Sequence, residues 1–159
     1  MNKEEIIQLI KSNSYFNVLD EKSIDFLADN AKYIEYNKDD FIFSYRDKAD
    51  SFYLIIKGKV NLQFFSHKKG EIVLEEKKEG EILGWSWLKE PYMWKFDGFS
   101  LTDSKLLVFN AEKIKSKMDK NNKFGYAVQS IFMNILIDRI QASRIRLLKE
   151  LGDNIYISE

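Results

Sequence analysis

The sequence contains no cysteine, a single histidine and a single proline in 159 residues. The absence of cysteine excludes disulfides, thiolate metal sites and a cysteine nucleophile. The lone histidine, His67, cannot form a histidine-cluster metal site, and a serine triad would require His67 itself as the base. We therefore expect no catalytic residue and no metal ligand in this chain.

An excess of charge of one sign and long hydrophobic runs are also missing. The 25 Lys and Arg residues balance 25 Asp and Glu residues, so no net charge attracts the chain to nucleic acid or to an anionic membrane. The opening residues, MNKEEIIQLIKSNS, hold no apolar run long enough for a signal peptide or a membrane span. The sequence therefore predicts a cytoplasmic protein with no membrane partner.

Apolar residues at helical spacing occupy both ends of the chain. One short helix is predicted over 3–10, and Asp20 is expected to cap a second one. The apolar residues of this second helix are Ile24, Leu27 and Ala31. After Asn110 the helical spacing returns and continues into a long helix from Phe124 to about Leu151.

The middle of the chain alternates apolar and polar residues instead. Segments such as FYLII and VNLQFF are separated by turn clusters with glycine at 58, 70, 80 and 84, and Lys69-Gly70 predicts a hairpin that contains His67. This spacing is typical of an antiparallel β jelly-roll barrel. We predict one mainly β domain over 1–159, with N-terminal helices in 1–31, the barrel in 32–110 and C-terminal helices in 111–151.

All three tryptophans and the only proline lie within ten residues, Trp85 to Trp94. Since proline disfavours the helical conformation in its predecessor, a short helical turn from Trp85 to about Leu88 should end before Pro91. The indole rings could fill a pocket with their own volume. Alternatively, they could line one, stacking on a planar ligand beside the Ser86 hydroxyl and the charge of Lys95, or form an exposed patch for protein contact.

The long C-terminal helix carries more apolar residues than one stripe needs. One interpretation is a helix packed entirely on its own barrel. The other is that one stripe covers the barrel and a second forms a coiled-coil-like seam with another copy, which predicts a homodimer. The predicted seam residues are Val128, Ile131, Ile135, Ala142 and Ile145.

Two acidic pairs, Asp39-Asp40 and Glu75-Glu76, are adjacent in the sequence and are candidates for acid–base chemistry. Neighbouring residues on a strand point to opposite faces of the sheet, so neither pair can act on one substrate. We expect them to be solvated surface.

The segment FSYRDKADSFYLIIKGKV, Phe43 to Val60, resembles the cyclic-nucleotide-binding domain family. The positions that agree with the family's pattern are Asp47, Ala49, Asp50, Phe52, Tyr53, Ile55, Gly58 and Val60. EKKEGEILG is similar to the approach to that family's phosphate-binding cassette, and SLTDSKLLVF to the strand pair after it. The resemblance extends from about Phe16 to Leu148 and implies the jelly-roll fold with a terminal helix.

The cassette itself departs from the family's pattern. Gly84 matches its glycine, but Trp85 stands where the family has glutamate, and Trp94 or Lys95 where it has arginine. Each charge-assisted hydrogen bond lost in this way is worth about 1.5–3 kcal/mol. The resemblance thus implies a non-catalytic, ligand-sensing regulatory module with altered or lost cyclic-nucleotide specificity. Its expected site residues are Leu83, Gly84, Trp85, Ser86, Trp87, Trp94 and Lys95.

We expect no required cofactor, and as ligand a cyclic nucleotide or another planar anionic small molecule. One alternative is a degenerate domain with a Trp-filled pocket that acts as a protein-interaction module. Another is the sensor part of a catabolite-activator-type regulator; such proteins continue into a helix-turn-helix domain, whereas this sequence ends at Glu159, so no DNA binding is expected of this chain alone. A jelly-roll enzyme of the cupin kind shares the barrel pattern, but this chain lacks the metal ligands that such an enzyme needs, because His67 is its single histidine.

Overall fold

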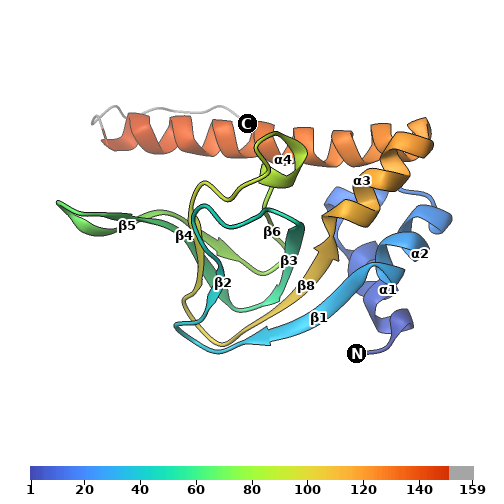
Figure 1. Cartoon of the computed structure of the whole chain (residues 1–159), viewed down its shortest axis with the longest axis horizontal. Coiled ribbons are helices and arrows are strands. Elements are labelled where there is room, and N and C mark those ends of the chain that lie inside the picture. The colour runs from blue at the N-terminus through green and yellow to red at the C-terminus, as the bar shows by residue number, and fades with distance from the viewer. Residues whose placement is uncertain (151–159) are drawn as a thin grey trace.

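Two antiparallel four-stranded sheets form the centre of the computed structural model, which describes residues 1–150 (Figure 1). Their strand orders are β1-β8-β3-β6 and β2-β7-β4-β5. The predicted jelly roll is confirmed, although no strand pairing in the described residues joins the two sheets into a closed barrel. The strands are β1 (Ala31–Tyr36), β2 (Phe41–Phe43), β3 (Ser51–Lys57), β4 (Lys59–Ser66), β5 (Gly70–Lys78), β6 (Ile82–Leu83), β7 (Asp97–Ser100) and β8 (Ser104–Asn110).

Helices precede and follow the sheets, as the sequence predicts. They are α1 (Lys3–Ser12), η1 (Ser14–Val18) and α2 (Glu21–Asp29) before the sheets, and α3 (Ala111–Lys120) and α4 (Asn122–Glu150) after them. One short 3₁₀ helix, η2 (Ser86–Leu88), lies between β6 and β7. The predicted cap is confirmed, since the Asp20 carboxylate accepts a hydrogen bond from the Ser23 N–H at 3.0 Å. Two details differ from expectation. The 3₁₀ helix η1 was not predicted, and Ala31 opens β1 because Asn30 already ends α2.

A cluster of aromatic rings joins the barrel to the C-terminal helix. Phe52 of β3 stacks on Phe109 of β8 with ring centroids 4.6 Å apart, and on Trp87 of η2 at 5.6 Å. Phe132 of α4 meets both Phe52 and Trp87 edge to face, each at 5.2 Å. Since such pairs stabilise by about 0.5–1.5 kcal/mol beyond their area, this cluster anchors α4 on the barrel.

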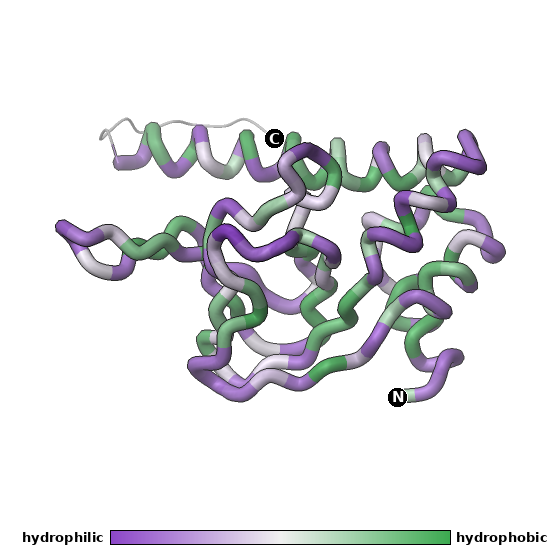
Figure 2. Tube along the Cα trace, viewed as in Figure 1, coloured by the Kyte–Doolittle hydropathy of each residue, from purple (hydrophilic) through white to green (hydrophobic). Residues whose placement is uncertain are grey.

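Helix α4 lies along one side of the molecule, from α3 to the projecting β4–β5 hairpin (Figure 1). Hydrophobic and hydrophilic segments alternate along its whole length (Figure 2). Within residues 1–150, neither this helix nor any other combines the length and apolar character needed to cross a membrane. Helix α4 instead packs against the core of the barrel and lines several cavities beside it.

The burial along α4 differs from the predicted division of its apolar residues between the barrel and a dimer seam. Val128, Ile131 and Ile135 are 2%, 2% and 4% exposed, so they pack inside the chain and are not available to a second copy. Ala142 is exposed and Ile145 is half-buried. The seam expected from these five residues is therefore not present as one surface. The barrel-facing stripe and the predicted dimer-facing stripe of α4 are both apolar. Which of them is buried depends on how the helix packs against the barrel.

Candidate functional site

The loop that follows β6 begins at a glycine with a constrained backbone. Gly84 has φ +85°, a left-handed conformation that residues with a Cβ adopt only at a cost. A Cβ at this position would lie 2.7 Å from Cη2 of Trp94, a separation too short for real contacts. The indole of Trp94 therefore occupies the space above Gly84, and only glycine fits beneath it.

Trp94 is held in place by stacking of its ring and by hydrogen bonds of its backbone. Its ring is 4% exposed and stacks on Phe43 with centroids 4.1 Å apart. Its backbone N–H donates to the Asp47 carbonyl at 2.9 Å, and its carbonyl accepts from the Arg46 N–H at 3.0 Å. These hydrogen bonds connect the turn after β2 to the tryptophan loop. Together with the stack on Phe43, they hold Trp94 in one position at the site.

A cavity of about 170 Å³, called the inner cavity below, lies between this loop, the barrel and α4. Trp94 and Phe43 form part of its wall, and Ser86, Lys95 and Arg139 contribute the polar groups. Its remaining lining residues are Leu62, Gly84, Trp85 and Phe96. The combination of aromatic faces with a few convergent polar groups is typical of small-molecule sites, although this volume is below the usual range of about 300–1,000 Å³.

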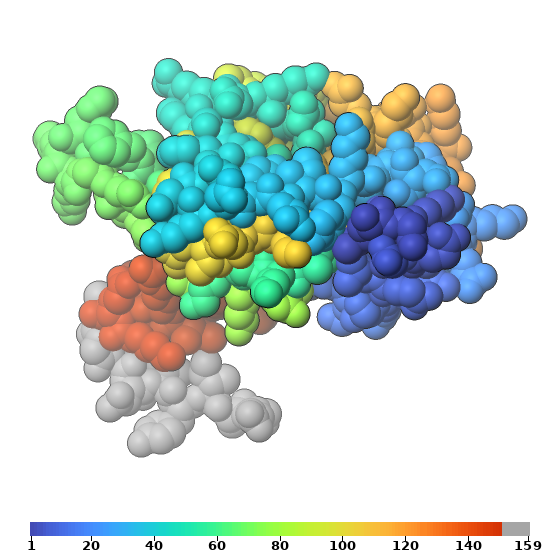
Figure 3. Space-filling model, turned by 90° about the horizontal axis from the view of Figure 1, so that it is seen from below, coloured from blue at the N-terminus to red at the C-terminus, as the bar shows by residue number. Residues whose placement is uncertain are grey.

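Two larger cavities adjoin it. The middle cavity, about 570 Å³, shares Leu62, Trp85, Phe96 and Arg139 with the inner cavity and is bounded by the C-terminal half of α4. The hairpin cavity, about 600 Å³, lies between β5 and the end of α4, where Figure 3 shows the hairpin projecting beside the helix. Arg139 lines all three cavities and is the residue that connects them.

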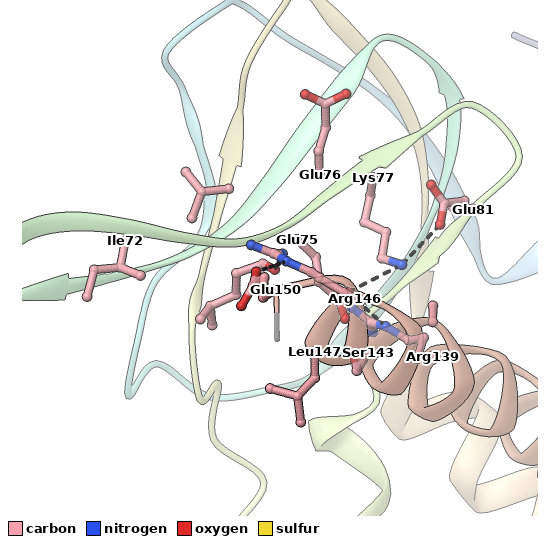
Figure 4. Close-up of a pocket in the computed structure, with 13 residues that line it drawn as sticks. Ile72, Glu75, Glu76, Lys77, Glu81, Arg139, Ser143, Arg146, Leu147 and Glu150 are labelled. Atoms are coloured by element: carbon pink, nitrogen blue, oxygen red, sulfur yellow. Dashed lines mark hydrogen bonds and ion pairs between the residues drawn. The ribbon is translucent and has the colours of Figure 1, made fainter. Parts of the chain in front are cut away.

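Arg139 is 8% exposed and pairs with a carboxylate of the sheet. Its Nε donates to Oε2 of Glu75 at 3.0 Å, its Nη2 donates to the same oxygen, and its Cζ lies 4.0 Å from the ring centroid of Trp85. Lys77 approaches Oε2 of Glu75 at 3.3 Å and pairs with Glu81 at 3.0 Å (Figure 4). The cationic guanidinium is therefore held between an aromatic face and a carboxylate.

Glu75 does not behave as the solvated residue that the sequence predicts. Burial raises the pKa of its carboxyl, but the hydrogen bonds and positive charges of Arg139 and Lys77 together outweigh burial, so the pKa lies below its ordinary value. Glu76 does point to the opposite side of β5 (Figure 4), where it pairs with Lys59 at 2.8 Å. The alternation along the strand was predicted correctly, but the ion pair with α4 was not.

The structure brings together five of the seven expected ligand-site residues. Gly84, Trp85, Ser86, Trp94 and Lys95 all line the inner cavity. Leu83 is fully buried in the core, and Trp87 belongs to the aromatic cluster, where its indole N–H has no hydrogen-bond partner among the described residues. The predicted helical turn before Pro91 is present as η2.

Sequence reasoning missed four residues of the inner cavity. Phe43 and Leu62 come from strands, where alternation could have identified them as inward-facing. Phe96 follows the tryptophan loop directly, and no local pattern assigns its side. Arg139 lies far along the chain on α4, and no spacing signal connects it with the loop.

Comparison with protein families supplies a framework for this geometry. The family model described as the cyclic nucleotide-binding domain matches residues 33–121, which is more than half of the chain. A search among curated proteins found no match at the sequence level. The matched range covers most of β1, all strands from β2 to β8 and the tryptophan loop, whereas all of α4 lies outside it.

Solved structures share the fold at low sequence identity. A putative cyclic nucleotide-binding protein from Geobacter metallireducens is 18% identical, with a TM-score of 0.75 over 88% of this chain and 98% of the other. A cyclic nucleotide-binding domain from Methylobacillus flagellatus is also 18% identical, with a TM-score of 0.77 over 99% and 85%. The regulatory domain of Toxoplasma gondii PKA, solved with cAMP, is 17% identical, with a TM-score of 0.63 over 72% and 43%.

Proposed function

Because the chain belongs to the cyclic nucleotide-binding domain family, we propose that it is a ligand-sensing regulatory module that acts in the cytoplasm without catalytic turnover. The ligand is a planar anionic small molecule, and specificity for cyclic nucleotides is altered. One observation carries this proposal: the inner cavity combines the faces of Trp85 and Trp94 with the cations Lys95 and Arg139. Such a lining favours a flat body with a negative group.

The altered specificity rests on the tryptophan loop. Neither a glutamate nor an arginine of the loop lines the inner cavity, and Trp94 fills the volume above Gly84. A ligand therefore lacks the donors and acceptors that the family's cassette provides, and finds Arg139 of α4 instead. The alternative, a pocket filled by its own side chains that serves protein contact, is favoured by the burial of Trp87 and Trp94.

Calorimetric titration with cAMP, cGMP and planar aromatic anions tests the proposal. We expect at least one of them to bind, and Trp85→Ala to weaken that binding about 5- to 150-fold, because stacking on an aromatic ring is worth about 1–3 kcal/mol. Phe65→Ala is the matched control, since Phe65 is 62% exposed on the hairpin and should leave affinity unchanged. No heat with any compound would favour the filled-pocket alternative.

A homodimer remains part of the proposal, but through a different surface of α4. Tyr126, Met133, Ile140 and Leu147 recur every seven residues and are 76%, 58%, 51% and 56% exposed. An apolar residue at every seventh position supplies one of the two apolar positions, a or d, of a coiled-coil heptad. Two members, Ile140 and Leu147, also line the middle cavity, so a ligand and a second copy would share one surface. This overlap provides a physical route for coupling binding to assembly.

Met133→Asp tests the seam without affecting the cavities, which Met133 does not line. We expect light scattering to give twice the chain mass for the native protein and a single chain mass for the variant, because a charge in an apolar seam is not compensated. Asn134→Asp adds the same charge at an adjacent exposed position and should leave the dimer intact. A native protein that is monomeric, or a variant that stays dimeric, would contradict the seam.

A further inference from the structure

The inner cavity has a one-sided charge. Its lining contains two cationic side chains, Lys95 and Arg139, and no carboxylate. Lys95 is exposed, so water weakens its attraction for an anion. Arg139 is 8% exposed, which leaves its charge far less screened. If an anionic group enters this cavity, the guanidinium is therefore its main electrostatic partner.

The guanidinium also retains donors for a ligand. Glu75 uses only Nε and Nη2, and both donate to a single carboxylate oxygen. Within residues 1–150, Nη1 donates no hydrogen bond, although arginine carries five N–H groups arranged in a fixed fork. The stacked ring of Trp85 holds this fork in one orientation. An oxyanion can therefore approach a positioned, partly unpaired guanidinium.

The position of Glu75 allows it to release Arg139 to such a ligand. Its carboxylate already lies 3.3 Å from the ammonium group of Lys77, so it keeps a cationic partner when Arg139 turns to another anion. Breaking a buried ion pair is costly chiefly because one charge is left uncompensated. Lys77 reduces that cost here, which makes exchange of one carboxylate for another feasible.

We propose that Arg139 is the anion receptor of the ligand site and that Glu75 is its built-in competitor. The proposal rests on the function proposed above and specifies the ligand as an aromatic molecule with a phosphate or carboxylate group. The inner cavity, about 170 Å³, accommodates that anionic group, and the middle cavity, about 570 Å³ and bounded by Leu136 and Ile140, accommodates the apolar body. Neither the loop nor its lysine is the principal anion site.

The test compares matched charged and neutral probes by calorimetry on the full chain. The pairs are 2-naphthoate with 2-naphthamide, and cAMP with adenosine, which separate a carboxylate source from a phosphate source. We expect the native protein to prefer the charged member of at least one pair. Glu75→Gln should strengthen the binding of that anion about tenfold and leave its neutral partner unchanged, because only the anion competes with the carboxylate.

Arg139→Gln should abolish the preference, a loss of about 10- to 100-fold for the anion. Arg139→Gln/Glu75→Gln should show the same loss, which excludes an uncompensated Glu75 carboxylate as its cause. Lys95→Gln should change affinity less than about fivefold. A preference for the charged probe that survives Arg139→Gln overturns this inference but leaves the proposed function standing. Binding that ignores ligand charge overturns both the inference and the anionic ligand class of the proposed function. Absence of binding by every probe to both native protein and Glu75→Gln overturns both.

Discussion

Replacing Trp94 with alanine is expected to lower the free energy of unfolding by about 3–5 kcal/mol, the usual cost of truncating a large buried aromatic side chain. The ring is 4% exposed, stacks on Phe43 at 4.1 Å and lies 6.1 Å from the ring of Tyr53. All of these contacts are lost, and the vacated volume joins the inner cavity, which Trp94 lines. Alanine can still form the backbone hydrogen bonds of residue 94. The decrease in the free energy of unfolding therefore measures the contribution of the indole ring.

Denaturant unfolding of the native protein and Trp94→Ala measures this effect. Trp85→Ala is the matched control, because Trp85 is only half-buried and its removal should cost clearly less. Added indole should raise the melting temperature of Trp94→Ala and not that of the native protein, since apolar cavities created by truncation bind small aromatic molecules. A cost below about 1 kcal/mol would instead identify Trp94 as a movable lid over an open pocket.

Gly84→Ala is expected to destabilise the chain by about 2–5 kcal/mol through two separable effects. The left-handed backbone at φ +85° costs a residue with a Cβ about 1–2 kcal/mol. The new Cβ would also lie 2.7 Å from Cη2 of Trp94, and such overpacking typically adds about 1–3 kcal/mol. Because Trp94 is fixed by its stack and its backbone, it cannot move away freely.

Gly80→Ala provides a matched control for the backbone effect alone. Gly80 has φ +84°, but a Cβ there meets nothing within 4 Å, so its substitution should cost only about 1–2 kcal/mol. Thermal or denaturant unfolding of both variants gives the difference. Combining Gly84→Ala with Trp94→Phe, which has a smaller ring, should recover part of the steric cost. Equal losses at the two glycines would show that Trp94 does not occupy the space above Gly84.

The conclusions from the sequence alone were most accurate where neighbouring residues decide the structure. Asp20 caps α2, Lys69-Gly70 lies at the turn of the β4–β5 hairpin, and Pro91 follows a short helical turn, each as expected. These features depend on residues two to four positions apart, so spacing reveals them. The family resemblance then predicted a ligand site at the tryptophan loop, and this loop lines the inner cavity.

The division of α4 between core and surface was beyond such reasoning. Val128 and Ile131 are buried, whereas Met133 and Ile140 are exposed, yet all four have comparable apolar character. Helical periodicity identifies the stripes but does not say which one meets the barrel. That choice is made by contacts such as Phe132 with Phe52, between residues remote in the sequence.

The sequence by itself determined the order of helices and strands, the jelly-roll class and the place of the tryptophan cluster, because local spacing and turn residues encode them. Only the tertiary structure decided that Trp94 fills the space above Gly84 while Trp85 faces a cavity. It also decided that Arg139 meets Glu75, 64 residues away. Contacts at such separation form when whole helices and strands pack against each other. No local sequence pattern indicates which distant residues will meet.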